Sequence, residues 1–482
     1  MLPVLTSDEM AAVDAAAPEP VEVLIGRAGG VVAREALDLL GGSYGRRVVV
    51  VAGKGNNGND GRAAARRLER RGVRVQVIAA PDAPPALPAS DLVIDAAYGT
   101  GFRGEYVAPD PAGAPVLAVD IPSGVNGLTG EAGGRPAVAV RTVTFAALKP
   151  GLLFHPGRGL AGDVTVADIG LDVSGAQVGL VEAADVARWI PARPPDSHKW
   201  RAAVLVAAGS PGMTGAAHLV ASAAYRAGAG MVRVATPGLE ADPALPTEAV
   251  GIGAPAAGWD AFVRDQLDRM GALVLGPGLG RGAPAVAAIH HLVGSAPVPL
   301  VIDGDGLSAL GDQAVEILCR RDSDASAVLT PHDGEFARLA GTPPGSDRIA
   351  AARRLATECD AIVLLKGPTT VVAHPNGRVR LSATGDARLA TAGTGDVLSG
   401  VIGALLAQGV DAFDAAAAGA WLHGRAAQEG PVQGLVASDV VEGLPAALAA
   451  LEREASPPRR RGIGRPGARS RVEDGGPGRG TA

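Results

Sequence analysis

Residues 53–61 (GKGNNGNDG) contain the first set of side chains that could do chemistry in this chain. They follow the apolar run 48–51 and satisfy the spacing G-x-G-x-x-G of a dinucleotide-binding turn. Backbone N–H groups and the N-terminus of a helix, which we expect to begin near Gly61, are enough to bind a phosphate. Asn56, Asn57 and Asp60 add side-chain oxygens that a phosphate turn does not need. The stretch therefore indicates a cation or a polar substrate.

The same stretch does not predict a resident NAD cofactor. A dinucleotide-binding unit has an acidic residue at the end of its second strand, where it binds a ribose hydroxyl. Here the next apolar run, 73–78, continues into Ala79, Ala80 and Pro81 before Asp82 appears. The acid of the fingerprint is missing, so the stretch does not match a site for a resident NAD cofactor.

Two further loops of the first half place an acid directly after an apolar run. Residues 95–101 (DAAYGTG) and 120–124 (DIPSG) each continue into a glycine turn. Ligands of an open α/β sheet bind at the carboxyl ends of its strands, so all three loops can line one crevice. Alone, Asp95 or Asp120 could merely cap a following helix. Their combination favours a site.

The second half carries another such stretch at 391–400 (TAGTGDVLSG), followed by an apolar helical run. Glycines that open a helix present free N–H groups to a phosphoryl group. Asp396 could then accept the proton of an attacking hydroxyl, although a helix cap is the alternative for this residue. Glycine-rich or acidic stretches also follow apolar runs at 276–280, 303–306, 331–335 and 366–371. The P-loop pattern G-x-x-x-x-G-K-[ST] is missing from the sequence.

Apolar runs alternate with helical segments throughout the chain, which predicts two α/β domains with parallel sheets. The predicted strands are 47–51, 73–79, 92–95, 116–120, 141–145 and 163–166 in the first half, and 204–208, 231–235, 272–275, 300–303, 327–330 and 361–366 in the second. The proline-rich segment 191–198 separates domains expected at 1–190 and 191–455. Residues 456–482 are rich in Pro, Gly and Arg and predict a disordered tail.

Composition narrows the class of protein. Of the 482 residues, 47% are hydrophobic and 20% charged, with a net charge of −6, so a soluble globular protein without a nucleic-acid partner is expected. The two cysteines exclude a disulfide framework and a cysteine-ligated zinc site. Residues 1–20 have neither a basic start nor a long apolar core, so we expect no signal peptide, no membrane anchor and a cytoplasmic location.

The three loops of the first half, together with residues 142–151 (TVTFAALKPG), resemble the NAD(P)H-hydrate epimerase family. The resemblance implies a Rossmann-like three-layer sandwich, and Asp120 as the proton-transferring residue at C6 of a hydrated nicotinamide ring. It implies K⁺ bound by Asn57, Asp95 and Ser123, whose hard oxygens suit an alkali cation. The implied substrate-binding residues are Asn56, Asn57, Gly58, Asn59, Asp60, Gly99, Thr100, Gly101, Phe102, Arg103, Gly104 and Glu105.

The stretches of the second half, together with residues 208–217 (AGSPGMTGAA), resemble the ribokinase-like fold and, within it, the ADP-dependent NAD(P)H-hydrate dehydratases. The resemblance implies Asp396 as the catalytic base, with Mg²⁺ accompanying ADP. It implies substrate contacts from Ala216, Gly278 and His332. The implied nucleotide-binding residues are Lys366, Gly367, Pro368, Thr369, Thr370, Val371, Gly393, Thr394 and Gly395.

These resemblances predict a bifunctional repair enzyme with small-molecule partners, expected as a homo-oligomer. Its first domain would interconvert the R and S hydrates of NADH and NADPH (NADHX and NADPHX). Its second would dehydrate the S form, consuming ADP and giving AMP and phosphate. Two alternatives stay open: a second domain that is a vitamin-precursor or sugar kinase, and a first domain that binds dinucleotides without catalysis.

Overall fold

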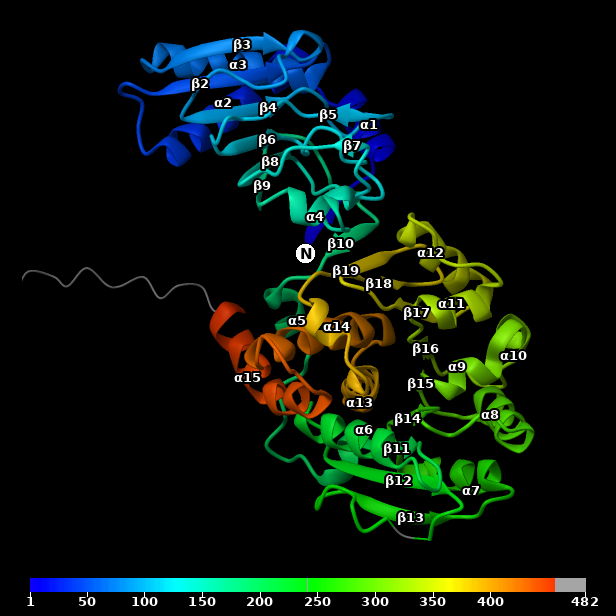
Figure 1. The fold of residues 1–482 in the computed structure, drawn as a ribbon. Coiled ribbons are helices and arrows are strands. Elements are labelled where there is room, and N and C mark those ends of the chain that lie inside the picture. Colours follow the sequence, from blue (N-terminus) through cyan, green and yellow to red (C-terminus); the bar gives the residue numbers. More distant parts are fainter. Residues whose placement is uncertain (241, 456–482) are drawn as a thin grey trace, which may run out of the picture.

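The computed structural model describes residues 1–240 and 242–455, which form two α/β domains (Figure 1). The predicted tail at 456–482 lies outside the described residues. No helix in the described ranges is both long and apolar enough to cross a bilayer.

The first domain is built on a six-stranded parallel sheet in the order β3-β2-β4-β6-β8-β9. Its strands are β2 (Arg47–Ala52), β3 (Arg74–Ala79), β4 (Leu92–Ala96), β6 (Val116–Val119), β8 (Arg141–Phe145) and β9 (Asp163–Ala167). All six correspond to strands predicted from apolar runs, which confirms the α/β class of this half.

Helices cover one face of the first sheet and loops cover the other. The helices are α2 (Val21–Leu40) and α3 (Asn56–Arg70), with Val32 and Leu68 completely buried against Val50 and Ile94. The smaller core on the other face includes Leu87 and residues of the loops after β3 and β4. The third layer of the expected sandwich therefore consists of loops in the part of the chain that is described.

The second domain contains an eleven-stranded sheet in the order β1-β10-β19-β18-β17-β16-β15-β14-β11-β12-β13. The six predicted strands of this half appear as β11 (Ala203–Ala207), β12 (Met231–Pro237), β14 (Ala272–Leu275), β15 (Leu300–Ile302), β16 (Ala327–Leu329) and β17 (Ile362–Leu365). Five short strands were not predicted: β1 (Leu2–Val4), β10 (Val178–Leu180), β13 (Val250–Ala254), β18 (Thr370–Ala373) and β19 (Val379–Ser382). The strands from β13 to β17 run parallel, and β18 and β19 form an antiparallel hairpin.

Helices pack on both faces of this sheet, as the ribokinase-like expectation requires (Figure 1). One face carries α6 (Gly215–Arg226), α13 (Thr394–Ala407), α14 (Ala412–Glu429) and α15 (Ala437–Ala455). The other carries α7 (Trp259–Asp265), α8 (Ala283–Ser295), α9 (Asp305–Leu310), α10 (Ala314–Cys319), α11 (Asp333–Ala340) and α12 (Arg348–Cys359).

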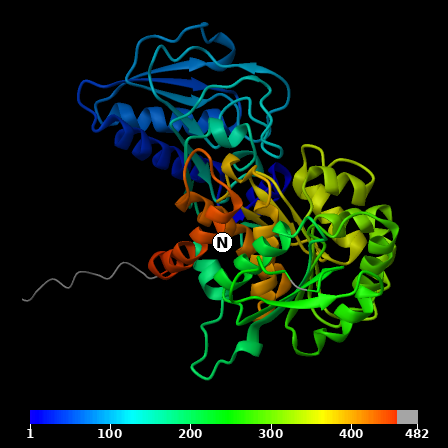
Figure 2. The same ribbon diagram turned by 60° about the horizontal axis from the view of Figure 1, so that its bottom comes forward.

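The two domains share secondary structure where they meet. Strands β1 and β10 belong to the first half of the sequence, yet β10 pairs with β19 and β1 pairs with β10. Helix α5 (Ala183–Trp189) likewise packs on α14 and α15. The N-terminus lies between the domains in both views (Figures 1 and 2). The expected division after residue 190 stays a prediction, but the chain enters the second sheet already at Val178.

Side-chain hydrogen bonds also join the domains. Thr369 Oγ1 donates to Leu153 O at 2.5 Å, and Arg158 donates to Ala383 O at 2.7 Å and to Pro368 O at 3.3 Å. Leu153 and Arg158 follow strand β8 of the first domain, whereas their partners lie beside the β18–β19 hairpin. These contacts fix the 366–371 segment against the first domain.

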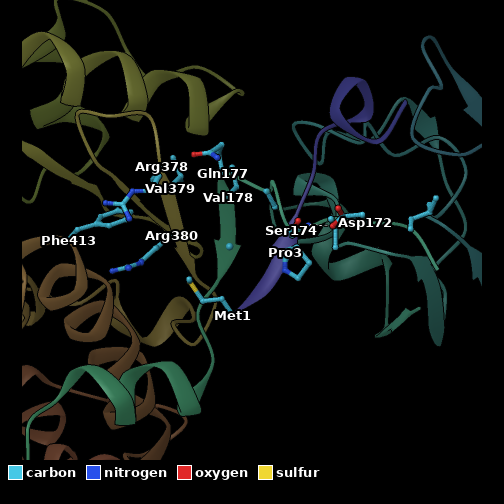
Figure 3. Close-up of a pocket in the computed structure, with 14 residues that line it drawn as sticks. Met1, Pro3, Asp172, Ser174, Gln177, Val178, Arg378, Val379, Arg380 and Phe413 are labelled. Atoms are coloured by element: carbon cyan, nitrogen blue, oxygen red, sulfur yellow. Dashed lines mark hydrogen bonds between the residues drawn. The ribbon is translucent and has the colours of Figure 1, made fainter. Parts of the chain in front are cut away.

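A cavity of about 560 Å³ lies at this joint (Figure 3). None of the predicted site residues lines it. Its arginines have local partners: Arg380 is paired with Asp414 and lies 4.1 Å from the ring centre of Phe413, over which Arg378 also lies. We therefore interpret this cavity as a gap in the packing between the domains and not as a catalytic site.

Candidate active sites

Helix α3 begins at Asn56, five residues before the start expected at Gly61. Gly55 is its N-cap, with an extended backbone, so residues 56–60 form the first helical turns and do not form a loop. Gly58 allows this early start, because a Cβ at that position would lie 2.0 Å from Gly53 O. The prediction of the helix start was wrong because a pair of asparagines and two glycines is a poor helix-forming sequence when taken without its tertiary contacts.

The three predicted K⁺ ligands surround one turn. Asp95 accepts hydrogen bonds from the hydroxyl and the backbone N–H of Ser123, at 2.6 and 2.8 Å. Ser123 Oγ also contacts the backbone of Tyr98, and the side chain of Asn57 lies beside the next residue, Gly99. Burial raises the pKa of Asp95, against the effect of the hydrogen bonds from Ser123.

The side-chain amide of Asn57 makes no hydrogen bond at this turn to any residue that the structure describes. Its amide oxygen and nitrogen are both buried without a hydrogen-bond partner among the described residues. A buried polar atom left unpaired costs about 1–3 kcal/mol. Within the described ranges, no group of three or more His, Cys, Asp and Glu residues is placed to bind a metal. The amide, hydroxyl and carboxylate oxygens here thus fit an alkali cation better than a transition metal.

Asp120 lies after β6 and is held by two different elements. Its Oδ1 lies 2.9 Å from Lys149 Nζ and accepts a hydrogen bond from Thr144 Oγ1 at 3.2 Å. Its Oδ2 accepts from the backbone N–H of Thr100 at 3.3 Å. The residue has a φ of 69°, which is rare outside glycine and is typical of functional positions.

A cavity of about 900 Å³ opens beside Asp120. The predicted residues that line it are Asn56, Asn57, Asp60, Gly99, Thr100, Gly101, Phe102, Arg103 and Asp120. Six others do not: Gly58 supports the helix, Asn59 accepts from Arg62 at 3.5 Å, and Gly104, Glu105 and two of the predicted K⁺ ligands, Asp95 and Ser123, lie outside the lining. The structure thus brings most of the predicted first site together.

Burial raises the pKa of two carboxyl groups that line this cavity, Asp14 and Asp60. Burial raises the pKa of Asp60 to about 8, and the negative charges of Asp120 and Asp14 add to the effect. Asp60 is therefore mostly protonated at neutral pH and can donate a proton. Asp14, which also lines the cavity, and Lys149 were not among the predicted site residues.

The second site centres on an ion pair. Asp303 follows β15 and Lys366 follows β17, and their side chains meet at 2.6 Å. Ser399, on α13, donates to the other oxygen of Asp303 at 2.7 Å. Asp303 is buried and Lys366 only partly so, which leaves one side of the ammonium group open. A Cβ on Gly395 would lie 3.2 Å from Lys366 Nζ, so the glycine lets the lysine approach the start of α13.

Asp396 lies in the first turn of α13, after Gly393 with its φ of 88°. Burial raises the pKa of Asp396 to about 7, with a further contribution from the charge of Asp303, while Lys366 acts in the opposite direction. A carboxyl with a pKa near 7 suits general-base catalysis at neutral pH. The candidate base and the free N–H groups of the helix are thus adjacent.

The other predicted substrate residues of this domain are placed as follows. Gly278 lies beside Ala216, since a Cβ on the glycine would lie 3.4 Å from the Cβ of the alanine. His332 caps α11, where its Nδ1 accepts from the backbone N–H of Gly334 at 3.0 Å, and its ring is otherwise exposed. Glu335, which was not predicted, is buried, and burial raises its pKa.

The predicted nucleotide-binding residues are only partly brought together. Lys366, Gly393 and Gly395 lie close to Asp396 or its neighbours. In contrast, the hydroxyl of Thr369 is bonded to Leu153 of the first domain, and Thr370 and Val371 belong to β18. The Thr394 hydroxyl donates to the loop before α13, at Leu389 O and Thr391 O.

Comparisons with known proteins cover both domains. The family model described as NAD(P)H-hydrate dehydratase matches residues 204–442, and that described as YjeF-related protein N-terminus matches residues 21–89 and 80–151. The bifunctional NAD(P)H-hydrate repair enzyme of Moorella thermoacetica is 37% identical, over 87% of this chain and 91% of its own length. That of Mycobacterium leprae is 40% identical, over 87% and 92%. A ribokinase-like superfamily protein from Enterococcus faecalis, 24% identical with a TM-score of 0.50, covers 58% of this chain and 98% of its own, and supports the fold alone.

Proposed function

We propose a function from the premise that the chain belongs to the family of bifunctional NAD(P)H-hydrate repair enzymes. The first domain interconverts the R and S hydrates of NADH and NADPH, and the second returns the S hydrate to NADH or NADPH. The observation that carries this proposal is that each domain places an Asp–Lys ion pair with one buried partner, Asp120–Lys149 or Asp303–Lys366, at the carboxyl ends of its parallel strands. Substrates of such sheets bind at that edge.

In the first domain, epimerisation proceeds through opening of the hydrated ring. Asp120 takes the proton of the C6 hydroxyl, the C6=O bond forms and the bond between C6 and the ring nitrogen breaks. The nitrogen takes a proton from Asp60, whose pKa of about 8 supplies an acid at neutral pH. Ring closure on the opposite face of C6 reverses these transfers and gives the other epimer.

We place a potassium ion at Asn57, Asp95 and Ser123. The unpaired amide of Asn57 supports this assignment, as do the oxygen ligands around Gly99. The ion supplies a fixed positive charge for the phosphates of the substrate when it is bound. The side chains of α3 and of the 99–103 loop then orient the substrate in the cavity.

In the second domain, dehydration proceeds through phosphorylation. Asp396 takes the proton of the C6 hydroxyl as its oxygen attacks the β-phosphorus of ADP, and AMP leaves. The bond between C6 and the oxygen then breaks, phosphate departs, and loss of a proton from C5 restores the C5=C6 double bond. Lys366 and the first N–H groups of α13 stabilise the charge on the phosphoryl group. Mg²⁺ neutralises nucleotide charge when it is bound.

The test supplies purified protein with each hydrate epimer, Mg²⁺, K⁺ and either ADP or ATP, and follows the recovery of nicotinamide absorbance. We expect conversion of both epimers by the unaltered chain, with ADP as donor. Asp120→Ala should consume only the S form and Asp396→Ala should consume neither. Accumulation of a stable phosphorylated product in place of NADH would instead favour a small-molecule kinase, and a first domain that interconverts neither epimer would favour a non-catalytic binding module. The homo-oligomeric state stays a prediction.

A further inference from the structure

Lysine is rare in this chain, and its positions are informative. Of the 44 Lys and Arg residues only four are lysines: Lys54, Lys149, Lys199 and Lys366. Two of them form ion pairs with an aspartate at the carboxyl edge of a sheet. Lys366 belongs to the segment already assigned to nucleotide binding, whereas Lys149 has no part in the reactions proposed above.

The ammonium group of Lys149 is enclosed by acceptors. Its side chain is 3% exposed, and Nζ lies 2.9 Å from Asp120 Oδ1. Nζ also donates to Thr144 Oγ1 at 2.8 Å and to the backbone oxygens of Phe145 and Ala147 at 2.9 and 3.1 Å. An ammonium group has three donors, so these acceptors occupy all of them. Lys149 thus has no free donor for a substrate, and any influence on the chemistry passes through Asp120.

The two oxygens of Asp120 have different surroundings as a result. Oδ1 is held by Lys149 and by the hydroxyl of Thr144, which is completely buried. Oδ2 lies toward the cavity loop, where it accepts from Thr100 N and where a Cβ on Gly99 would lie 3.1 Å from it. Oδ1 thus has two side-chain partners, one of them a cation at 2.9 Å, whereas Oδ2 has one backbone donor at 3.3 Å, so the stronger constraint acts on Oδ1.

The backbone supports the same orientation. Asp120 has a left-handed φ of 69° and its N–H donates to Val143 O on β8 at 2.6 Å. The segment after β8 turns through Ala146, which also has a positive φ, and returns Lys149 to the end of that strand. Two unusual backbone conformations directly after neighbouring strands therefore bring the lysine and the aspartate together.

We propose that Lys149 is a positioning residue of the first site: it fixes Asp120 through Oδ1 and so presents Oδ2 to the C6 hydroxyl of the hydrated nicotinamide ring. The inference rests on the epimerase activity proposed for this domain. Asp120 Oδ2 then takes and returns the hydroxyl proton, while Lys149 keeps its own protons and makes no contact with the substrate.

The test compares Lys149→Met with the unaltered chain on the R epimer, without nucleotide, so that only epimerisation runs. The R-to-S conversion is followed by chromatography with K⁺ present. We expect kcat to fall about 10²-fold, the lower end of what acid–base catalysis contributes. KM should stay within about 2-fold, because the ammonium group has no donor left for the substrate. A lower substrate affinity with an unchanged kcat would overturn the proposal.

A double-mutant cycle separates positioning from a general structural effect. If Lys149 acts through Asp120, Lys149→Met should lower the rate little further in an Asp120→Asn background. Equal losses in both backgrounds would refute the coupling. Lys149→Arg, which keeps a cation at Oδ1, should recover part of the lost kcat.

Dehydration of the S epimer with ADP serves as an internal check of folding, since the residues proposed to carry it out lie in the second domain. If Lys149→Met also loses that activity and its thermal transition, the variant is misfolded and Thr144→Val is tested in its place. Thr144→Val removes the other hydrogen bond to Asp120 Oδ1 with little change in the shape of the side chain. It should lower kcat and leave KM unchanged; an unchanged kcat would count against the proposal. Absence of R-to-S conversion in the unaltered chain would instead refute the epimerase function itself.

Discussion

Lys366 and Asp303 form an ion pair of 2.6 Å between the ends of two strands that are not neighbours, since β16 lies between β15 and β17. Ser399 of α13 holds the second oxygen of Asp303. The pair therefore joins the centre of the sheet to the helix whose first turn carries Asp396. Its two charges act on that residue in opposite directions.

The pH dependence of dehydration should report this arrangement. Asp396 acts as a base only when deprotonated, and burial with the charge of Asp303 raises its pKa to about 7. We expect kcat/KM for the S epimer to rise about tenfold per pH unit below pH 7 and to level off above it. Asp305→Asn should move the rising part of this pH profile to lower pH, because the charge of Asp305 also raises the pKa of Asp396. A flat profile between about pH 5.5 and 8 would contradict the assignment of Asp396 as the base.

Replacing Asn57 should abolish the response of the first domain to potassium. Bound K⁺ stabilises the folded state by mass action, by about 2.7 kcal/mol at a hundred times its Kd. Asn57→Leu keeps the approximate size of the side chain but removes both unpaired amide atoms. We expect the variant to be at least as stable as the unaltered chain in LiCl and to show no further rise in Tm in KCl. Asn56→Leu, exposed and one residue away, is the control and should keep the rise.

The early start of α3 should depend on Gly58. Gly58→Ala places a Cβ 2.0 Å from Gly53 O, so the helix or the strand must move, and overpacking of this kind costs about 1–3 kcal/mol or more. Gly55→Ala, at a position with open space and a negative φ, should change stability by less than about 1 kcal/mol. Denaturant unfolding of the two variants measures the difference. Similar losses in both would show that the close approach is not what requires glycine.

Removing one hydroxyl should weaken the coupling between the domains. Thr369→Val removes the hydrogen bond to Leu153 O and leaves that carbonyl buried, at a cost of about 1–3 kcal/mol. Thr370→Val is the matched control, because its hydroxyl makes only a long contact of 3.4 Å to Gly367 O. Differential scanning calorimetry should show the two domain transitions moving apart in Thr369→Val and not in Thr370→Val. Unchanged transitions in both would mean that the strand pairing and the hydrogen bonds of Arg158 are enough to couple the domains.

The sequence predicted the strands that are marked by an apolar run in their own residues. All twelve predicted strands are present, because long β-branched or apolar runs bounded by turns already determine a buried parallel strand. The seven strands that it missed in the described part of the chain, among them the two-residue strands β5 (Tyr106–Val107) and β7 (Gly134–Arg135), are short or polar. Strand β19 contains Arg380, and β13 contains two glycines, so only pairing with neighbours from distant parts of the chain makes them strands.

In the candidate sites, too, residues with a local sequence signal were predicted and residues that depend on distant contacts were missed. Acids that follow strands were identified from the sequence because the carboxyl edge of a parallel sheet is where they meet. Lys149 and Glu335 were missed because nothing beside them in the sequence indicates their partners: Lys149 pairs with Asp120, 29 residues earlier. The scarcity of lysine in an arginine-rich chain was the available signal. The nucleotide-binding role that the resemblance implies for Thr369 stays a prediction, and nothing in the sequence indicated that its hydroxyl donates to Leu153 of the first domain.

The pairing of β1 with β10, and of β10 with β19, has a consequence for the order in which the protein can be completed on the ribosome. Val379, the first residue of β19, is translated 375 residues after Val4. At about 5–20 residues per second, synthesis of this stretch takes roughly 20–75 s. Strand β19, with which β10 pairs, is not available before then. Nascent chains paused before residue 379 should therefore lack the β10–β19 pairing that attaches β1 and β10 to the second sheet, even when the first sheet has already folded.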